Sequence, residues 1–305
     1  MSEVIKNRYD FVVLFDCENG NPNGDPDAGN LPRIDPETQL GYVTDVCLKR
    51  KIRNYVEMTR ENKEGYKIYI SEGTPLNLKD KEAIDYLGIE LKDNEKTKKK
   101  TVKKDAAGDL KVRDFMCKNY YDIRTFGAVM TTFVRGGMNC GQVTGPVQLT
   151  FAQSIDPIFP QEISITRMAV TTEKDAETKK NTIGKKAFIP YGLYRAEGFV
   201  SANLAQKVTG FSEDDLNLLW EAITNMFEND HSASRGKMAV RELIVFKHSS
   251  EFGDCPSHKL FDQIEVVKKA DVETPRKYND YEVIIHEDKI PQSVELQRKL
   301  SSLNK

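Results

Sequence analysis

The sequence predicts an α+β domain with an antiparallel sheet and long insertions. Its strands and helices do not follow the regular alternation of a doubly wound parallel fold. Two of the expected strands flank a long charged segment, which is typical of a projecting hairpin. At 305 residues, the chain is long enough for one large or two ordinary domains.

The first expected strand and helix enclose the most distinctive stretch, residues 9–56. YDFVVLFD, from Tyr9 to Asp16, is rich in aromatic and β-branched residues and predicts a buried strand. Thr44 is a suitable N-cap for a helix over TDVCLKRKIRNYV, whose apolar residues recur on one side. Three basic residues of this helix fall on its flank and opposite side: Lys49, Arg50 and Arg53.

Between these two elements lie more than twenty residues rich in Asn, Gly, Pro and Asp. A loop of that length inside a compact domain is usually functional or disordered. One interpretation is a turn-rich surface loop over the sheet edge. The other is a polar bowl, floored by the basic helix, that holds a polyanion through amides and a cation. The candidate contacts in the bowl are Asn19, Asn21, Asn23 and Arg33.

The middle of the chain is less regular. We expect a strand over residues 66–71, a helix over 78–91 and a second helix over 114–121. The lysine-rich stretch 92–111 has no apolar periodicity, so we expect a solvated linker or, alternatively, a mobile arm that touches phosphate.

Arg124 and Phe126 place a cation and a ring two residues apart. Such a pair could contact a phosphate and stack on a base, although core packing of Phe126 is an equal alternative. Arg135 opens a glycine-rich segment, 135–145, that lacks both the Walker A and the dinucleotide-binding patterns.

The next segments predict a strand over residues 146–155, in the middle of the sheet, and an extended hairpin over 162–187. A long exposed hairpin invites unwanted pairing unless a partner covers it, which favours a binding role. Its candidate contacts are Arg167, Met168 and Lys185.

The last third contains the clearest helix, which begins at Ser212 with a capping-box pattern and carries Trp220 on its apolar face. A strand ending near His248 follows, and Arg235 before it is a candidate phosphate contact. We expect one more strand over residues 281–286 and then a polar end that frays.

Composition and motifs argue against several chemistries. The five widely spaced cysteines include no CxxC pair, which indicates a reducing, cytoplasmic location without disulfides. The formal net charge is −2, so any nucleic-acid binding depends on how the charges are distributed. We find no signal peptide and no apolar run long enough to span a membrane.

Catalytic and metal sites are weakly supported. The four histidines lie in the last quarter without a GxSxG motif, and the ligand types in 248–258 make only a weak zinc signal. Asp25 and Asp27 could help to hold Mg²⁺, but turn-forming aspartates are the favoured interpretation. We therefore expect no enzyme activity, metal or cofactor.

The chain resembles the CRISPR-associated backbone proteins of the RAMP superfamily. It is most similar to the repeated large subunit of type I Cascade complexes, and closest to the type I-C branch. The matching stretches span most of the chain in family order and begin with YDFVVLFDCENGNPNGDPDAGNLPRIDPETQLGYVTDVCLKRKIRNYV. The others are DIRTFGAVM, TGPVQLTFAQSIDPI, ITRMAV, GLYRAEG and MFENDHSASRGKMAVRELIVFKH.

This resemblance implies a single hand-shaped domain over residues 1–305 with an RNA-recognition-motif-like (ferredoxin-like) core. It implies a finger-like insertion at 72–121 and a thumb hairpin at 165–187. Copies would stack head to tail along one guide RNA (crRNA), beside other Cascade subunits, and present it to target DNA. The alternative is a metal-dependent ribonuclease of the type III kind that uses Asp25 and Asp27.

Overall fold

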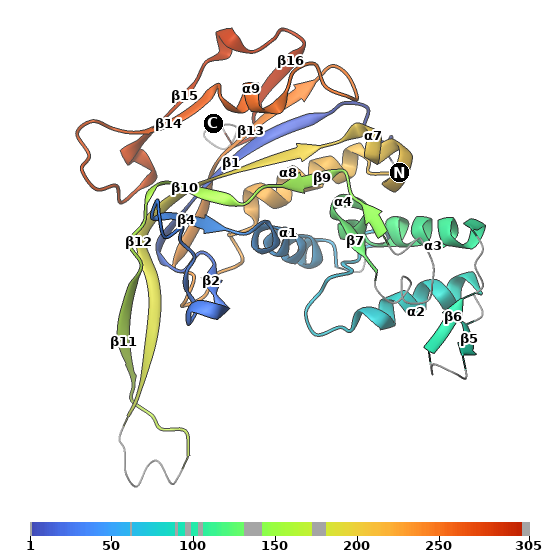
Figure 1. The fold of residues 1–305 in the computed structure, drawn as a ribbon, viewed down its shortest axis with the longest axis horizontal. Helices are drawn as coiled ribbons and strands as arrows, with labels where there is room; N and C mark the ends of the chain where they lie inside the picture. The colour runs from blue at the N-terminus through green and yellow to red at the C-terminus, as the bar shows by residue number, and fades with distance from the viewer. Residues whose placement is uncertain are drawn as a thin grey trace.

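A computed structural model describes residues 2–61, 63–88, 91–94, 99–102, 106–130, 142–172 and 181–300. Its main element is an eight-stranded antiparallel sheet (Figure 1). The strands, in chain order, are β1 (Tyr9–Gly20), β4 (Leu40–Val43), β9 (Val147–Leu149), β10 (Ala152–Pro157), β11 (Gln161–Arg167), β12 (Thr182–Val200), β13 (Lys237–His248) and β16 (Val294–Arg298). This large antiparallel sheet in a mixed α/β architecture confirms the coarse prediction of fold class.

The long strands β1, β12 and β13 form the centre of the sheet. Its order is β16-β13-β1-β12-β10-β4, and β9 and β11 each pair with β12. The register between β1 and β13 shifts at Leu14 and Phe15. β1 is buried over nearly its whole length, as the run of aromatic and β-branched residues predicts.

Helices α1 (Asp45–Thr59) and α8 (Glu213–Asn225) pack on one face of the sheet. α1 begins at Thr44, whose Oγ1 accepts a hydrogen bond from the backbone N–H of Cys47. α8 begins with the predicted capping box of Ser212 and Asp215. Trp220 is 6% exposed and meets the Phe11 ring edge-on, so it belongs to the core, as expected.

A C-terminal segment covers the opposite face of the sheet. It consists of α9 (Ser257–Phe261), β14 (Ile264–Lys268), β15 (Tyr281–Ile285) and two 3-10 turns, η4 (Tyr278–Asp280) and η5 (Glu287–Lys289). The strand expected over 281–286 is therefore confirmed. The fraying end is wrong up to residue 300, because β16 pairs with β13 along the edge of the sheet.

A lobe with its own hydrophobic cluster lies beyond the end of α1 (Figure 1). Its elements are α2 (Leu76–Leu87), β5 (Leu91–Asn94), β6 (Lys99–Val102), α3 (Ala106–Asn119), α4 (Tyr121–Phe126), β7 (Gly127–Val129) and β8 (Gln142–Thr144). α2 and α3 pack together through apolar residues such as Ile84 and Met116.

The lobe corrects two sequence predictions. Residues 66–71 form no strand, because only Lys67 makes a bridge, with Tyr120, while Ile68 and Tyr69 are buried in an irregular segment. The stretch 92–111 contains the strand pair β5–β6 and the start of α3 rather than only a linker. Its apolar pattern is too weak to reveal helix packing from sequence.

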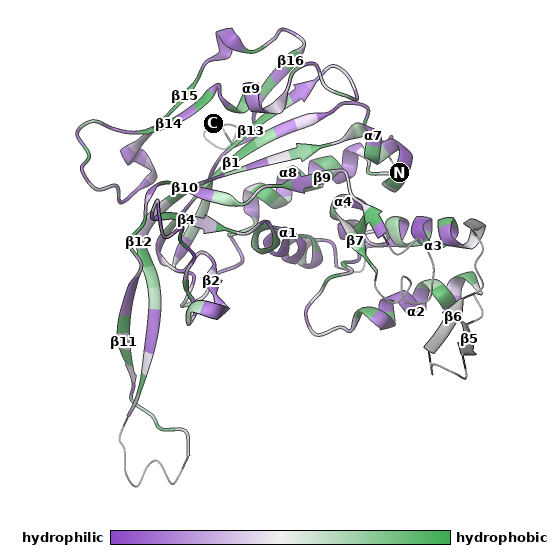
Figure 2. Ribbon diagram, in the orientation of Figure 1, coloured by the Kyte–Doolittle hydropathy of each residue, from purple (hydrophilic) through white to green (hydrophobic). Residues whose placement is uncertain are grey.

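The hairpin formed by β11 and the first part of β12 projects from the sheet (Figure 1). All seven residues of β11 are exposed. Figure 2 shows hydrophobic residues along β11, and these include Ile163 and Ile165. The predicted extended hairpin is confirmed, and β12 continues from it into the centre of the sheet.

Short elements complete the chain. β2 (Gly24–Asp25), the 3-10 turn η1 (Pro26–Ala28) and β3 (Leu31–Pro32) lie in the loop after β1, and α7 (Ala202–Leu204) and the π-helical turn η3 (Ala205–Thr209) follow β12. The strand predicted over 146–155 is divided into β9 and β10. Both lie to one side of β12, so the expected central position is wrong.

Candidate nucleic-acid interface

The loop after β1 is attached to the first turn of α1. The Asn23 side-chain oxygen accepts hydrogen bonds from the Thr44 backbone N–H at 3.0 Å and from the Thr44 hydroxyl at 3.1 Å. The Cys47 thiol contacts the Pro22 carbonyl oxygen at 3.7 Å. The polar loop and the basic helix therefore share one face, as the bowl hypothesis requires.

A second loop, residues 230–236, joins this face from the far end of the sequence. The Asn21 backbone N–H donates to the Ser234 carbonyl at 2.8 Å. At Gly20, an added Cβ would lie 1.8 Å from the Arg235 carbonyl oxygen, so only glycine allows the two loops to approach this closely. Gly236 turns the chain into β13 at a φ of +64°.

Cations gather where these loops meet α1. Lys51, Arg235 and Arg33 all act electrostatically on the Cys47 thiol, together with Asp230. Burial raises the pKa of Cys47, and the three cations partly oppose that shift. We name Arg33, Lys51, Asp230 and Arg235 the loop cluster.

The members of the loop cluster differ in exposure. The side chain of Lys51 is 6% exposed and is paired with Asp230, while that of Arg235 is 38% exposed. Arg33 is 22% exposed, with its Nη2 3.5 Å from an oxygen of Asp25. Arg33 and Arg235 are therefore the members that can reach a ligand on this surface.

The solvent-facing side of α1 connects the loop cluster to the rest of the helix. Arg50 lies on this side, is half-buried, and has no ion pair or side-chain hydrogen bond with the described residues. Lys49 is 13% exposed, pairs with Asp45 at 2.9 Å, and lies 5.6 Å from the centre of the Phe126 ring. Arg50 is thus the basic residue of α1 most available to a ligand.

Arg53 and Phe126 are placed inside the fold. Arg53 Nε donates to Asp122 Oδ2 at 2.9 Å, and the two side chains are 9% and 1% exposed. The Arg53 guanidinium lies 5.2 Å from the centre of the Phe126 ring, which is itself buried. We therefore remove both residues from the predicted contact surface, in favour of the core-packing alternative for Phe126.

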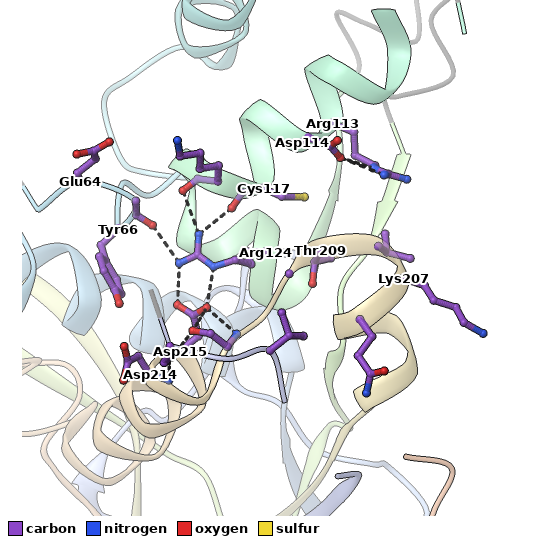
Figure 3. Close-up of a pocket in the computed structure, with 18 residues that line it drawn as sticks. Glu64, Tyr66, Arg113, Asp114, Cys117, Arg124, Lys207, Thr209, Asp214 and Asp215 are labelled. Carbon is purple, nitrogen blue, oxygen red and sulfur yellow. Dashed lines mark hydrogen bonds and ion pairs between the residues drawn. The ribbon is translucent and has the colours of Figure 1, made fainter. Parts of the chain in front are cut away.

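Arg124 is also internal, and Figure 3 shows it at the centre of a polar junction. Its guanidinium donates to both carboxylate oxygens of Asp215, at 2.9 and 2.7 Å, and to backbone carbonyls of Cys117 and Gly65. Burial by itself lowers the pKa of Arg124, but the hydrogen bonds to Asp215 and the negative charge of its carboxylate together raise that pKa above its usual value. The guanidinium is committed to holding α3, α4 and α8 together.

A cavity of about 540 Å³ adjoins this junction. Its wall combines the N-terminal residues, α3, η3 and the start of α8, and includes Tyr66 and Thr209 (Figure 3). It lies on the lobe side of the molecule, apart from the loop cluster.

The hairpin residues are the most exposed of the predicted contacts. Met168 is 83% exposed at the end of β11. Arg167 donates to the carbonyl of Ala169 and to the Thr171 hydroxyl. Lys185 is 70% exposed and pairs with Glu162 at 2.6 Å, which raises the Lys185 pKa through a side-chain hydrogen bond.

The remaining predicted contacts divide between surface and interior. Asn19 is exposed and has a φ of +51°, a backbone that asparagine tolerates well. Asn21 is 8% exposed, and its amide donates to the Asn30 carbonyl, so it organises the loop. Arg135 lies outside the described residues.

Two of the candidate metal ligands, Asp25 and His248, make hydrogen bonds within the protein. Asp25 caps η1 by accepting from the Asp27 backbone N–H. His248 is fully buried, with Nε2 2.9 Å from Asp10. Among the described residues, no group of three or more His, Cys, Asp or Glu side chains is arranged to hold a metal ion. In the same part of the chain, no helix has the length and apolar character needed to cross a membrane.

A family model described as "CRISPR-associated protein Cas7" matches residues 7–286. The chain belongs to the Cas7 family. The match includes the loop after β1, α1, the hairpin and the loop cluster, so the whole candidate interface lies within family sequence.

Individual relatives are more distant. A Cas7 protein of Haloferax volcanii, described as CRISPR-associated protein Cas7, is 26% identical over 272 residues, which cover 81% of this chain and 72% of the relative. A chain from a structure described as "CRISPR RNA-guided surveillance complex, pre-nicking" has a TM-score of 0.47 at 13% identity, with 78% of each chain covered. A second CRISPR RNA-guided surveillance complex gives 0.44 at 11% identity, covering 78% of this chain and 68% of that one.

Sequence reasoning missed two members of the Cas7 chain's loop cluster, Lys51 and Asp230. Lys51 lies among the basic residues of α1, but its side chain is buried rather than exposed to solvent. Asp230 lies 179 positions away, and no local pattern links it to Lys51. The packing of α1 against α8 and the pairing of β1 with β13 bring the two together.

Proposed function

We propose that this Cas7-family chain is a non-catalytic backbone subunit that binds crRNA. In this proposal, copies stack head to tail along the guide in the cytoplasm, alongside other Cascade subunits, and present the guide for pairing with target DNA. Family membership supports the role in a CRISPR complex. The surface formed by α1 and the two loops supports the binding of a polyanion.

One observation carries the RNA-binding proposal. Two loops separated by about two hundred residues, 21–33 and 230–236, converge on the first turns of α1 and bring Arg33 and Arg235 near Cys47, while Arg50 lies on the solvent-facing side of the same helix. Cations, exposed asparagine amides and backbone groups grip phosphate and sugar without reading base edges. A subunit that carries any guide sequence needs that kind of contact.

The finer assignment rests on the motif resemblance. We place the chain in the type I-C branch, with an RNA-recognition-motif-like core, a finger-like insertion at 72–121 and a thumb at 165–187. The hairpin and the lobe project on the same side of the sheet, with α1 and β2 between them (Figure 1). That arrangement suits an RNA strand crossing α1, and the exposed Met168 at the end of β11 suits an apolar wedge.

The proposal is tested by the salt dependence of binding to unrelated single-stranded RNAs. Each phosphate contact contributes about 0.7 to the slope of log affinity against log salt on a single strand. The variant R33A/R50A/R235A is expected to lower that slope by about 2 and to lose guide RNA on copurification. Wild type is expected to bind all sequences with similar affinity.

The matched control removes three exposed cations from the opposite side of the sheet, as K259A/K269A/R276A. It changes the net charge by the same amount and is expected to leave the slope nearly unchanged. Equal losses in the two variants would show that binding follows total charge rather than this surface, and the interface assignment would then be wrong.

The absence of catalysis is part of the proposal. Asp25 caps η1 and faces Arg33, which leaves it poorly placed to hold Mg²⁺. Incubation of purified complexes with complementary RNA and Mg²⁺ should yield no cleavage. Regularly spaced fragments that disappear in Asp27→Ala would establish the ribonuclease alternative instead.

A further inference from the structure

Three charged side chains of the loop cluster form a chain from the interior to the surface. Lys51 Nζ pairs with Asp230 Oδ2, and Arg235 Nη1 lies 3.0 Å from Asp230 Oδ1. Their exposed fractions rise from 6% for Lys51 to 12% for Asp230 and 38% for Arg235. A single carboxylate therefore joins a buried cation to an exposed one.

The backbone and the guanidinium of Arg235 are each held by a different part of the structure. Its backbone is held by β1, because its carbonyl packs against Gly20 and the neighbouring Ser234 carbonyl accepts from the Asn21 N–H. Its guanidinium is held by Asp230, through the carboxylate and through the Asp230 carbonyl at 3.2 Å. A guanidinium has five N–H donors, so these contacts leave others free for a ligand.

The charges of Lys51, Asp230 and Arg235, which we call the trio, also fit an anionic ligand. Lys51 balances Asp230, so the three side chains together retain one positive charge, and Arg235 presents that charge at the surface. Without Lys51, Asp230 would cancel much of the attraction of Arg235 for phosphate. Without Asp230, the Arg235 guanidinium would be free to sample other rotamers, and the cost of ordering it would remove its phosphate contact.

We propose that Asp230, anchored by Lys51, is a positioning residue that aims the Arg235 guanidinium at a phosphate of the bound RNA. This inference rests on the proposed RNA-binding function. It assigns a role in binding a polyanion to an acidic residue, and it explains why Lys51 is buried beside a surface that is otherwise rich in available cations.

The test is the double variant K51M/D230N in the full-length chain. It removes one positive and one negative charge, so the net charge is unchanged and Arg235 itself is not substituted. Removing both partners avoids leaving one buried charge without its partner, which is the change that strongly destabilises a protein. With single-stranded RNA oligonucleotides as the probe, we expect about a tenfold loss of affinity and a fall of about 0.7 in the salt slope.

A mutant cycle separates positioning from support of the fold. R235A is expected to show the same loss as K51M/D230N, and the triple variant to show little more, because both changes remove one contact. A purely structural role for the trio would lower the folded fraction, and so shift affinity without changing the salt slope. Thermal melts of each variant measure that fraction directly.

A second variant covers the case in which K51M/D230N does not fold. D230N alone raises the net charge by one, so charge alone predicts tighter RNA binding, whereas positioning predicts weaker binding. Glu228→Gln is the control, because Glu228 is exposed nearby and carries the same charge change without contacting Arg235. It should bind RNA at least as tightly as wild type.

The positioning role would be overturned if K51M/D230N bound RNA with the affinity and salt slope of wild type, or if D230N bound RNA more tightly than wild type. Either result would leave the RNA-binding proposal intact. Failure of the wild-type protein to bind RNA at any salt concentration would instead refute the proposed function itself. The two failures are therefore distinguishable in one set of titrations.

Discussion

Helix α4 and the loop cluster both combine arginine with a carboxylate, but they use the ion pair differently. All six residues of α4 are buried, and its two charged side chains pair with residues of α1 and α8. In the loop cluster the buried charge is a lysine, and the arginine faces solvent. Burial of the guanidinium therefore decides whether an arginine serves the fold or a ligand.

The difference also follows from what the arginines contact. Arg124 satisfies carbonyls at the end of α3 and the carboxylate that caps α8, so it replaces missing helix-end hydrogen bonds. Among the described residues, the Arg235 side chain makes two polar contacts, both to Asp230, and keeps free donors. The predictions below test this contrast, from the largest effect to the smallest.

Arg124→Ala should have the largest effect on stability. It leaves Asp215 buried without its partner and removes hydrogen bonds to several carbonyls, so we expect a loss of about 3–5 kcal/mol in the free energy of unfolding. Urea denaturation followed by circular dichroism measures it. A loss below 1 kcal/mol, accompanied by weaker RNA binding in the folded protein, would place Arg124 with the ligand-facing arginines instead.

Arg53→Ala should also act on stability rather than on RNA. Asp122 would keep its hydrogen bonds from the backbone N–H groups of Tyr69 and Ile70, so the expected loss is smaller, about 2–3 kcal/mol. The folded fraction should bind RNA with the wild-type salt slope. A reduced slope without destabilisation would return Arg53 to the contact surface.

Arg50→Ala should show the opposite pattern. Arg50 has no partner among the described residues, so the free energy of unfolding should change by less than about 0.5 kcal/mol. The RNA salt slope should fall by about 0.7. Lys207→Ala, which removes an exposed cation near the cavity beside Arg124, is the matched control and should leave the slope unchanged.

Thr44→Ala should weaken the junction between the loop and α1. The change removes the N-cap of α1 and one hydrogen bond to Asn23, at a cost of about 1 kcal/mol. Thr44→Ser keeps the hydroxyl and should recover most of that stability. If serine does not recover it, the methyl group rather than the cap accounts for the loss.

The smallest effect concerns the thiols. Burial raises the pKa of Cys117, beside Arg124, to about 12, so alkylation at pH 8 should be very slow and should quicken roughly tenfold per pH unit. Burial also raises the pKa of Cys47, which is only partly buried, and bound RNA should protect it further. Mass spectrometry after iodoacetamide treatment, with and without RNA, compares the two sites.

Sequence patterns predicted the elements whose signals are local. The buried β1, the Thr44 cap and the capping box of α8 depend on a few neighbouring residues, and each is confirmed. The extended hairpin is likewise confirmed, because apolar strands flank a charged segment.

The rest depends on contacts that are distant in sequence. Arg53 and Arg124 have the composition of ligand-binding residues, and only Asp122 and Asp215 reveal that they are buried. Asp230 looks like an ordinary turn residue until β13 places it beside Lys51. Local patterns thus identify basic residues but not which of them face solvent.

The central claim is that RNA crosses the exposed side of α1 between the two loops. The most direct measurement is photo-crosslinking of 4-thiouridine RNA to the assembled protein, followed by mass spectrometry of the linked peptides. We predict crosslinks in residues 19–33, 50 and 230–236, and at the end of β11 near Met168. Crosslinks confined to α9, β14 and β15, on the opposite face of the sheet, would contradict the account.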